Sequence, residues 1–190
     1  MADQPPPPRL NNVSYVAMAL IGESGASPHD LVDMHRRGAT IYYAVAESKL
    51  YAEPKRLEAM GYVRSRKAPG KTRERTVYTL TRKGTAALRR WAVLPSPLPR
   101  IQNEAIVRLI SGDIVGDDRK LLTGLLALRE EIDRQEALLD LARDRLVTLP
   151  HRARYLLLTH SLGMRLLEAH RQWLDEVERE LGGPDGTAKS

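Results

Sequence analysis

The sequence predicts a mainly α-helical chain with one small β-hairpin, in which a winged helix-turn-helix is followed by long helices. Three observations lead to this fold class. Apolar residues recur at helical spacing in three segments of the first half of the chain. Two short runs rich in β-branched and aromatic residues then flank a Pro-Gly turn. In the second half, leucines recur at alternating spacings of three and four residues.

The first two helices are predicted from an apolar stripe and from capping residues. Residues 13–21 place apolar side chains at i, i+3, i+4, i+7 and i+8, which form a single stripe on a helix. Asn11 or Asn12 can cap this helix, and Gly22 can end it. The second helix opens at residues 27–30, where Ser27 is a good N-cap and Asp30 occupies the capping-box position.

A third helix is expected over residues 48–60, with Leu50, Leu57 and Met60 on its inner face. Pro54 lies past the first turn and removes the hydrogen bond to the Leu50 carbonyl, at a cost of about 3 kcal/mol in a regular helix. We therefore expect a kink near Leu50 or a 3₁₀-like first turn. The side chains expected to face outward are Lys49, Ala52, Lys55, Arg56 and Ala59.

A hairpin with a basic tip is expected next. Residues 62–66 and 75–80 are the two strand-like runs, and Pro69-Gly70 between them is a turn signal. Thr81 then caps a fourth helix that ends near Ala92. Against the single negative charge of Glu74, the hairpin carries six positive charges, at Arg64, Arg66, Lys67, Lys71, Arg73 and Arg75.

Prolines mark the boundary between the two halves of the chain. Pro95, Pro97 and Pro99 interrupt any helix. The predicted organisation is a disordered leader at 1–10, a winged helix-turn-helix domain at 11–94, a linker with a short helix at 95–116, a long-helix dimerisation domain at 117–182, and a disordered tail at 183–190.

The second half carries two long helices separated by Pro150, each with a heptad-like apolar seam. A helix with such a stripe is marginal in water unless the stripe is covered. The two helices either cover each other within one chain or pair with a second copy. Because both are far longer than a winged helix needs, a homodimer is the favoured alternative. The candidate dimerisation residues are Leu121, Leu125, Leu128, Ile132, Leu139, Tyr155, Leu162, Leu166 and Trp173.

The positive charge is concentrated in the first half. The formal net charge is +6, and residues 1–94 hold 16 Lys and Arg against 8 Asp and Glu. The remainder holds 14 against 16. This asymmetry indicates that the first half meets a polyanion. The alternative is a simple imbalance that serves solubility.

Several classes of protein are excluded or disfavoured. The absence of cysteine excludes a disulfide framework, a thiolate zinc site and a cysteine nucleophile. No run of about 18 apolar residues and no secretory signal occurs, so we expect a cytoplasmic protein without a membrane segment. The histidines lack metal-binding spacing, and no nucleotide-binding loop or nucleophile elbow is present. We therefore expect neither an enzyme nor a bound cofactor.

The order helix, helix, helix, basic hairpin, helix is that of a winged helix-turn-helix. A helix fits the major groove of double-stranded DNA, and clustered cations gain affinity by releasing counterions from the phosphates. A solvated basic hairpin is the alternative for the wing alone, and a winged-helix protein-interaction module without sequence-specific DNA binding is the alternative for the whole. The candidate DNA-binding residues are Ser48, Lys49, Tyr51, Lys55 and Arg56 on the helix, and Arg64, Arg66, Lys67, Lys71 and Arg73 on the wing.

Two motifs resemble the PadR-type transcriptional regulators. Leu50-Tyr51 with residues 54–63 is similar to the recognition-helix signature of that family, and residues 77–84 are similar to its wing exit. The long helices are similar to the C-terminal domain of the longer PadR subfamily. The second helix departs from the family pattern, because Pro28-His29 stands where Gly-Tyr is usual.

The resemblance implies a homodimer, an operator with inverted symmetry, repression as the default action, and release by a small effector. Trp91 and Trp173 are the candidate residues for stacking a small aromatic effector. The alternative for both tryptophans is ordinary packing in a core or an interface.

Overall fold

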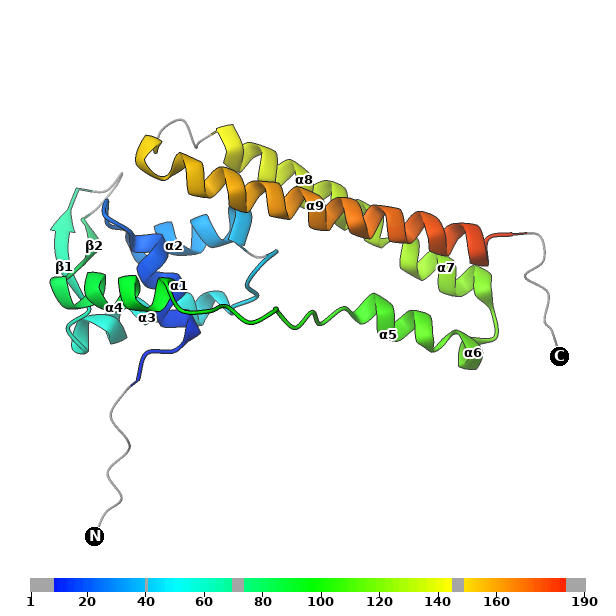
Figure 1. Ribbon diagram of the computed structural model, residues 1–190, viewed down its shortest axis with the longest axis horizontal. Helices are drawn as coiled ribbons and strands as arrows, with labels where there is room; N and C mark the ends of the chain where they lie inside the picture. The colour runs from blue at the N-terminus through cyan, green and yellow to red at the C-terminus, as the bar shows by residue number, and fades with distance from the viewer. Residues whose placement is uncertain (1–8, 40, 70–73, 145–148, 184–190) are drawn as a thin grey trace, which may run out of the picture. The chain divides into compact units, whose positions relative to one another are not determined.

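The computed structural model describes residues 9–39, 41–69, 74–144 and 149–183 (Figure 1). It confirms the predicted fold class, a mainly helical chain with one two-stranded hairpin and long helices in its second half. The chain divides into two compact units, Met1–Pro97 and Leu98–Ser190, and the division falls within the stretch predicted as a linker. Most of the predicted leader and tail lies outside the described residues.

The first two helices begin where their capping residues predict. Helix α1 spans Asn12–Ile21, and Asn11 is its N-cap. The Ser14 amide donates to Asn11 Oδ1, and the Asn11 amide donates to Ser14 Oγ, both at 3.0 Å. Helix α2 spans Pro28–Met34 and opens with the same reciprocal box between Ser27 and Asp30. Local hydrogen bonds therefore fix both helix starts.

A short π-helix, η1 (His35–Ala39), follows α2 and was not expected from the sequence. His35 is buried, and its Nε2 donates to the Tyr43 carbonyl oxygen at 2.8 Å. Arg36 forms a two-pronged ion pair with Glu47, with Nε and Nη2 at 2.5 and 2.6 Å from the carboxylate oxygens. These contacts tie the end of α2 to the start of the next helix across the intervening loop.

Helix α3 spans Glu47–Ala59 and passes through Pro54 without interruption. Of the two expected alternatives, a kink near Leu50 or a 3₁₀-like first turn, the second has support in a hydrogen bond of the first turn. The Lys49 amide donates to the Ala46 carbonyl at 2.9 Å, which is a 3₁₀-type bond, and the Leu50 amide donates to the same carbonyl at 3.2 Å. Pro54 is fully buried, so the apolar contacts of its ring offset the missing hydrogen bond.

The hairpin pairs β1 (Val63–Ala68) with β2 (Arg75–Leu80) in antiparallel register, from Val63 opposite Leu80 to Ala68 opposite Arg75. Ala26 forms an isolated antiparallel β-bridge with Tyr78 of β2. The amide of Ala26 donates to the Tyr78 carbonyl at 3.0 Å, and its carbonyl accepts from the Tyr78 amide at 2.8 Å. The base of the hairpin is thus attached to the segment that leads into α2. The core of this unit consists of Ala17, Met18, Ile21, Ala26, Leu31, Leu50, Leu57, Val63 and Tyr78.

Helix α4 (Arg82–Ala92) closes the first unit and approaches the start of the hairpin closely. Thr81 Oγ1 donates to the Gly61 carbonyl at 2.7 Å, and Lys83 Nζ donates to the Met60 carbonyl at the same distance. Gly84 lies directly against the Tyr62 carbonyl, and a Cβ on Gly84 would stand 2.0 Å from that oxygen. Only glycine fits at this position.

The second unit consists of short helices followed by a long antiparallel pair. Helices α5 (Glu104–Ile110) and α6 (Gly112–Val115) lead into α7 (Asp118–Leu126). Helix α8 (Leu128–Asp144) follows after a break at Ala127, so the single predicted helix is two.

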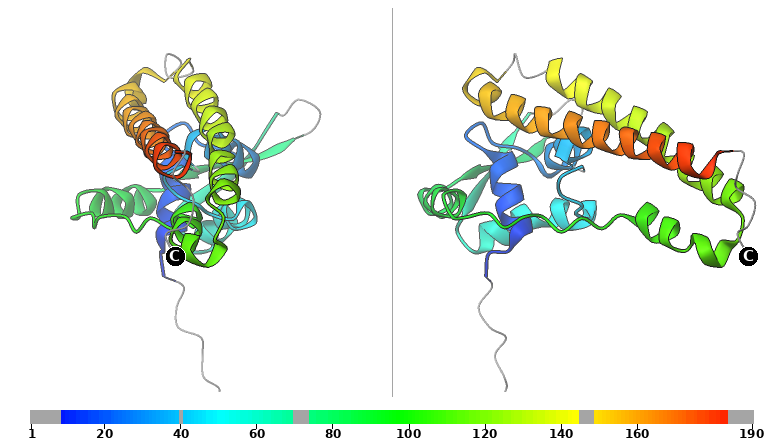
Figure 2. Two further views of the ribbon diagram at one scale, coloured as in Figure 1. Left: turned by 90° about the vertical axis from the view of Figure 1, so that its right-hand side faces the viewer. Right: turned by 45° about the vertical axis from the view of Figure 1, so that its right-hand side comes forward.

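Helix α9 (Pro150–Leu181) runs back along α7 and α8, as Figures 1 and 2 show. Two arginines join α8 and α9 reciprocally. Arg129 on α8 binds Asp175 and Glu178, while Arg171 on α9 binds Asp133 and Glu136, with distances of 2.6–2.8 Å. The apolar side chains buried between these helices are Leu125, Ile132, Leu139, Leu167, Leu174 and Val177. No helix in the described part of the chain combines the length and apolar character needed to cross a bilayer.

Replacement of Gly84 by alanine is expected to lower the free energy of unfolding by about 3 kcal/mol, because the new methyl group overlaps the Tyr62 carbonyl. The matched control is Gly124→Ala in α7, where a Cβ meets nothing within 4 Å. That control should raise stability by about 0.5–1 kcal/mol. Denaturant unfolding of both variants measures the difference, and equal stability of Gly84→Ala and the wild type would contradict the packing described.

Candidate nucleic-acid interface

The exposed face of α3 forms the first part of the candidate interface. Ser48, Ala52 and Lys55 are exposed and follow one another at spacings of four and three, so they share one stripe. Tyr51, which is 57% exposed, flanks this stripe on one side, and exposed Lys49 flanks it on the other. The opposite face is buried and consists of Leu50, Glu53, Pro54 and Leu57.

The flank of α3 that carries Tyr51 faces the base of the wing. Glu58, on the same flank, accepts a hydrogen bond from the Ser65 amide of β1 at 2.8 Å. Burial raises the pKa of Tyr78 in β2, and the nearby Glu58 and Tyr51 groups raise it further. The wing is therefore fixed beside the exposed stripe of α3.

The wing presents basic side chains on both of its faces. Because neighbouring side chains alternate along a strand, Arg64 and Arg66 share one face of β1 and Lys67 lies on the other. All three are exposed. Arg64 and Lys67 make only long contacts, each at 3.4 Å, to the threonine hydroxyls opposite them. Lys71 and Arg73, the other two wing candidates, lie outside the described residues.

Arg75, the last cation of the wing, is engaged within the unit. Its Nη1 lies 3.1 Å from Asp30 Oδ2 at the start of α2. Burial alone would raise the pKa of Asp30, but the hydrogen bonds from Ser27 and the charge of Arg75 outweigh it, so the pKa is lowered. Arg75 therefore holds the wing against α2.

Arg56 does not face outward with the other helix candidates, contrary to the sequence expectation. Its Nε and Nη2 bind both carboxylate oxygens of Glu53, at 2.9 and 2.5 Å, and Nη2 also donates to Ser14 Oγ at 2.6 Å. Glu53 and Ser14 are buried. Because its donors are used inside the unit, we no longer assign Arg56 to a groove contact.

The surviving candidates lie on one part of the winged-helix unit. In Figure 2 the wing and α4 project on opposite sides of that unit, and α3 lies toward the side of the wing. Helix α4 also carries exposed basic residues, Arg82, Lys83, Arg89 and Arg90, but the helix itself projects away from the wing in Figure 2. The candidate interface therefore consists of Ser48, Lys49, Tyr51, Lys55, Arg64, Arg66 and Lys67.

The two tryptophans proposed for an effector site have different surroundings. Trp91 belongs to the first unit and stacks on Tyr15 of α1, with ring centroids 4.5 Å apart and planes 7° from parallel. One face of its ring is thus already covered, as the packing alternative expected. Trp173 belongs to the second unit and is partly buried on α9.

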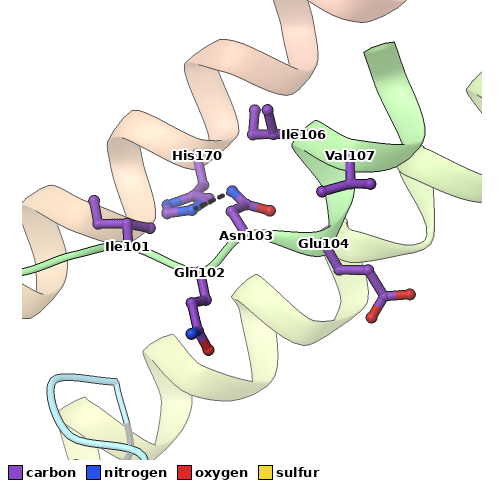
Figure 3. Close-up of a pocket in the computed structure, with 7 residues that line it drawn as sticks. All are labelled: Ile101, Gln102, Asn103, Glu104, Ile106, Val107 and His170. Atoms are coloured by element: carbon purple, nitrogen blue, oxygen red, sulfur yellow. Dashed lines mark hydrogen bonds between the residues drawn. The ribbon is translucent and has the colours of Figure 1, made fainter. Parts of the chain in front are cut away.

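A groove of about 920 Å³ lies in the second unit, and neither tryptophan lines it. Figure 3 shows its lining, in which His170 of α9 points toward Asn103 at the start of α5. Asn103 Nδ2 donates to His170 Nε2 at 3.4 Å, while His170 Nδ1 donates to the Leu166 carbonyl at 2.7 Å. The two residues lie far apart in the sequence, so no short motif could have indicated the groove. The apolar part of the lining is Ile101, Ile106 and Val107.

The dimerisation candidates separate into two groups. Leu125, Ile132 and Leu139 are buried between α7, α8 and α9 of the same chain, so the in-chain alternative is correct for these three. Tyr155 and Leu162 of α9 are 67% and 52% exposed. The remaining candidates, all partly buried, are Leu121, Leu128, Leu166 and Trp173. Within the described residues, no cluster of three or more histidine or acidic side chains could hold a metal ion.

Comparison with known proteins gives a family model that matches part of the chain. Residues 33–90 match the model of the transcriptional regulator PadR-like family, a segment that runs from the end of α2 to near the end of α4. No curated protein matches the sequence.

Several solved structures share the fold. PadR of Bacillus subtilis in complex with operator DNA is 17% identical, with a TM-score of 0.73, and the match covers 90% of this chain and 99% of that one. The PadR-like regulator BC1756 of Bacillus cereus is 16% identical, with a TM-score of 0.77 and coverage of 95% and 99%. The virulence activator AphA of Vibrio cholerae is 20% identical, with a TM-score of 0.66 and coverage of 90% and 98%.

A second structure of Bacillus subtilis PadR, in complex with p-coumaric acid, is 16% identical, with a TM-score of 0.67 and coverage of 90% and 99%. The resemblance drawn from the sequence is confirmed. Residues 33–90 are similar to the PadR-like family, and the chain shares its fold with solved PadR-like transcriptional regulators.

Proposed function

We propose that this protein is a sequence-specific DNA-binding transcriptional regulator that acts as a homodimeric repressor. The observation that carries the proposal is the pairing of an exposed helix face with a cationic hairpin beside it. Ser48, Tyr51 and Lys55 can reach base edges when α3 lies in the major groove, because they share its exposed side. Arg64, Arg66 and Lys67 can reach the phosphates beside that groove.

The distribution of ion pairs supports this assignment. Four other arginines of the unit are held by carboxylates: Arg36, Arg37, Arg56 and Arg75. Lys49, Lys55 and Arg66 have no ion-pair partner in the described part of the unit. Cations without internal partners can release counterions from a duplex without first breaking a bond of their own. The fold shared with operator-bound PadR of Bacillus subtilis favours the same use of this surface.

The proposal of a homodimer rests on an apolar stripe that the single chain leaves uncovered. Tyr155, Leu158 and Leu162 lie on one side of α9, and all three are more than half exposed. Leu166 and Trp173 continue the stripe at helical spacing. Contiguous exposed apolar surface is typical of an interaction site. A second copy related by a two-fold axis would cover the stripe and match an operator with inverted symmetry.

Release of DNA by a small aromatic compound completes the proposal. The similar Bacillus subtilis PadR has been solved with p-coumaric acid, which gives a probe of the right chemical class. In this chain, Trp173 is the better placed of the two tryptophans, since Trp91 already stacks on Tyr15. Repression is the action that the PadR resemblance implies.

Duplex selection by the full-length protein is expected to enrich a sequence with inverted symmetry. Lys55→Ala should then relax the sequence choice, since a lost base contact costs about 1–3 kcal/mol of discrimination. Arg66→Ala with Lys67→Ala should weaken binding to all duplexes alike and lower the salt slope by about two. Binding is measured by fluorescence anisotropy at several salt concentrations.

The control for lost charge in this experiment is Arg89→Ala, on the outer face of α4. This variant should bind as the wild type does. Failure of the wild type to enrich any duplex, or equal effects of the α3 and wing variants on selected and random DNA, would overturn the assignment.

Leu162→Glu is expected to convert the dimer to a monomer, because it places a charge in the exposed stripe of α9. Leu157→Glu is the matched control, since Leu157 lies on a different side of the same helix and is 47% exposed. Sedimentation velocity of both variants reports the oligomeric state. A monomeric wild type, or a Leu162→Glu variant that sediments as the wild type does, would contradict the proposed interface.

Titration with p-coumaric acid is expected to quench tryptophan fluorescence and to release the selected duplex. The sequence has two tryptophans, so Trp91→Phe leaves Trp173 as the only reporter, and Trp173→Phe leaves Trp91. Quenching should persist in Trp91→Phe and be lost in Trp173→Phe. If the compound releases DNA but quenches the fluorescence of neither single-tryptophan variant, neither tryptophan belongs to the effector site.

A further inference from the structure

A buried polar cluster joins α1 to α3 in the winged-helix unit. It consists of Ser14 on α1 and of Glu53 and Arg56 on α3. The residues Ser14 and Glu53 are 0% and 6% exposed, whereas every other buried side chain on the inner face of α3 is apolar. A buried carboxylate is stable only when it is paired and hydrogen-bonded, so Glu53 requires the guanidinium of Arg56.

Arg56 reaches beyond its own helix. Its Nη2 donates to Ser14 Oγ at 2.6 Å, and its Nη1 donates to the Arg9 carbonyl at 3.2 Å, just before α1 begins. The hydrogen bonds that Arg56 donates to the Glu53 carboxylate raise the pKa of Arg56, and the guanidinium stays charged. The planar fork therefore connects Glu53 on α3 with two points at the start of α1.

The Ser14 hydroxyl uses its full hydrogen-bonding capacity in this cluster. It donates to Asn11 Oδ1 at 3.0 Å, and it accepts from the Asn11 amide at 3.0 Å as well as from Arg56. One donor and two acceptor sites are all that a hydroxyl offers. The first turn of α1 and the guanidinium from α3 thus hold the same oxygen atom.

These directional hydrogen bonds fix the rotation of α3 about its own axis, which apolar packing does not fix. Leu50 and Leu57 hold α3 against the core, but apolar contact has no preferred direction about the helix axis. A rotation of α3 by about 15° would move a side-chain tip about 6 Å from its axis by about 1.5 Å. A shift of that size is enough to take Ser48, Tyr51 or Lys55 out of hydrogen-bonding range of a base edge.

We propose that Arg56 is a positioning residue for DNA recognition: bonded to Glu53 and Ser14, it fixes the rotation of α3 about its axis and so aims the exposed side chains. This inference rests on the proposed DNA-binding function. It gives Arg56 an effect on sequence choice without any contact to a base.

The test compares affinities for the duplex selected by the wild type and for a scrambled duplex of equal composition. The variants are Ser14→Ala, Arg56→Lys and the double variant. Arg56→Lys keeps the charge beside Glu53 but loses the fork. Asn11→Ala controls for a weakened α1 cap, because it removes the side-chain acceptor of Ser14 but keeps the donor of Arg56 and the hydroxyl of Ser14 that accepts from it. Arg89→Gln on α4 controls for the loss of one exposed positive charge.

Ser14→Ala and Arg56→Lys are each expected to lower the ratio of selected to scrambled affinity about fivefold, with affinity for the scrambled duplex unchanged. The double variant should lower this ratio no further than the more damaging of the two single variants does, because both changes break the same link. Asn11→Ala should leave the ratio within about twofold of the wild type. Hydrogen exchange without DNA should be faster in α3 of Ser14→Ala but unchanged in α4.

The opposite results overturn the inference. If Arg56 itself contacted a base, Ser14→Ala would leave the ratio unchanged, and the effects of the two single variants would add. If a loose α1 were the cause, Asn11→Ala would reproduce the loss of Ser14→Ala. A wild type that selects no duplex would instead refute the proposed function, and unchanged exchange in α3 would refute the positioning role alone.

Discussion

The first unit depends on burying one side of α3 against α1 and α2. Leu50, Pro54 and Leu57 supply the apolar contact, and the same contact leaves the other side of the helix in solvent. The wing follows from this arrangement, because Glu58 near the end of α3 binds the Ser65 amide of β1, and the Tyr62 carbonyl just before β1 binds Thr81, the N-cap of α4. One packed surface therefore decides which residues face water, and with them which can meet a partner.

Local signals in the sequence were sufficient for most of this unit. The N-cap signals at Asn11 or Asn12 and at Ser27 act over three or four residues, so they can be read without knowing the fold. Arg56 could not be placed in this way. Its position in the helix is compatible with either side, and what draws it inward is Glu53, an acid at a spacing that also suits an exposed pair. A carboxylate on the apolar side of a helix was the available clue.

The second unit shows where periodicity alone is ambiguous. A stripe of leucines indicates that one face of a helix is covered, but it does not indicate which neighbouring helix covers it. The structure divides the candidates: Leu125, Ile132 and Leu139 are covered within the chain, whereas Tyr155 and Leu162 of α9 stay exposed. The break between α7 and α8 at Ala127 was equally hidden, since alanine is a strong helix former and gives no signal for an interruption.

The reciprocal arginines of α8 and α9 have a mechanical consequence. Arg129 projects from one helix and Arg171 from the other, and each bridges two carboxylates on the opposite helix. A slip of α9 by one helical turn, about 5.4 Å, would part both arginines from their partners at once. The two ion-pair groups therefore oppose sliding of α9 along α8 in either direction. A displacement at one end of this pair would thus carry both helices together, without a change in their register.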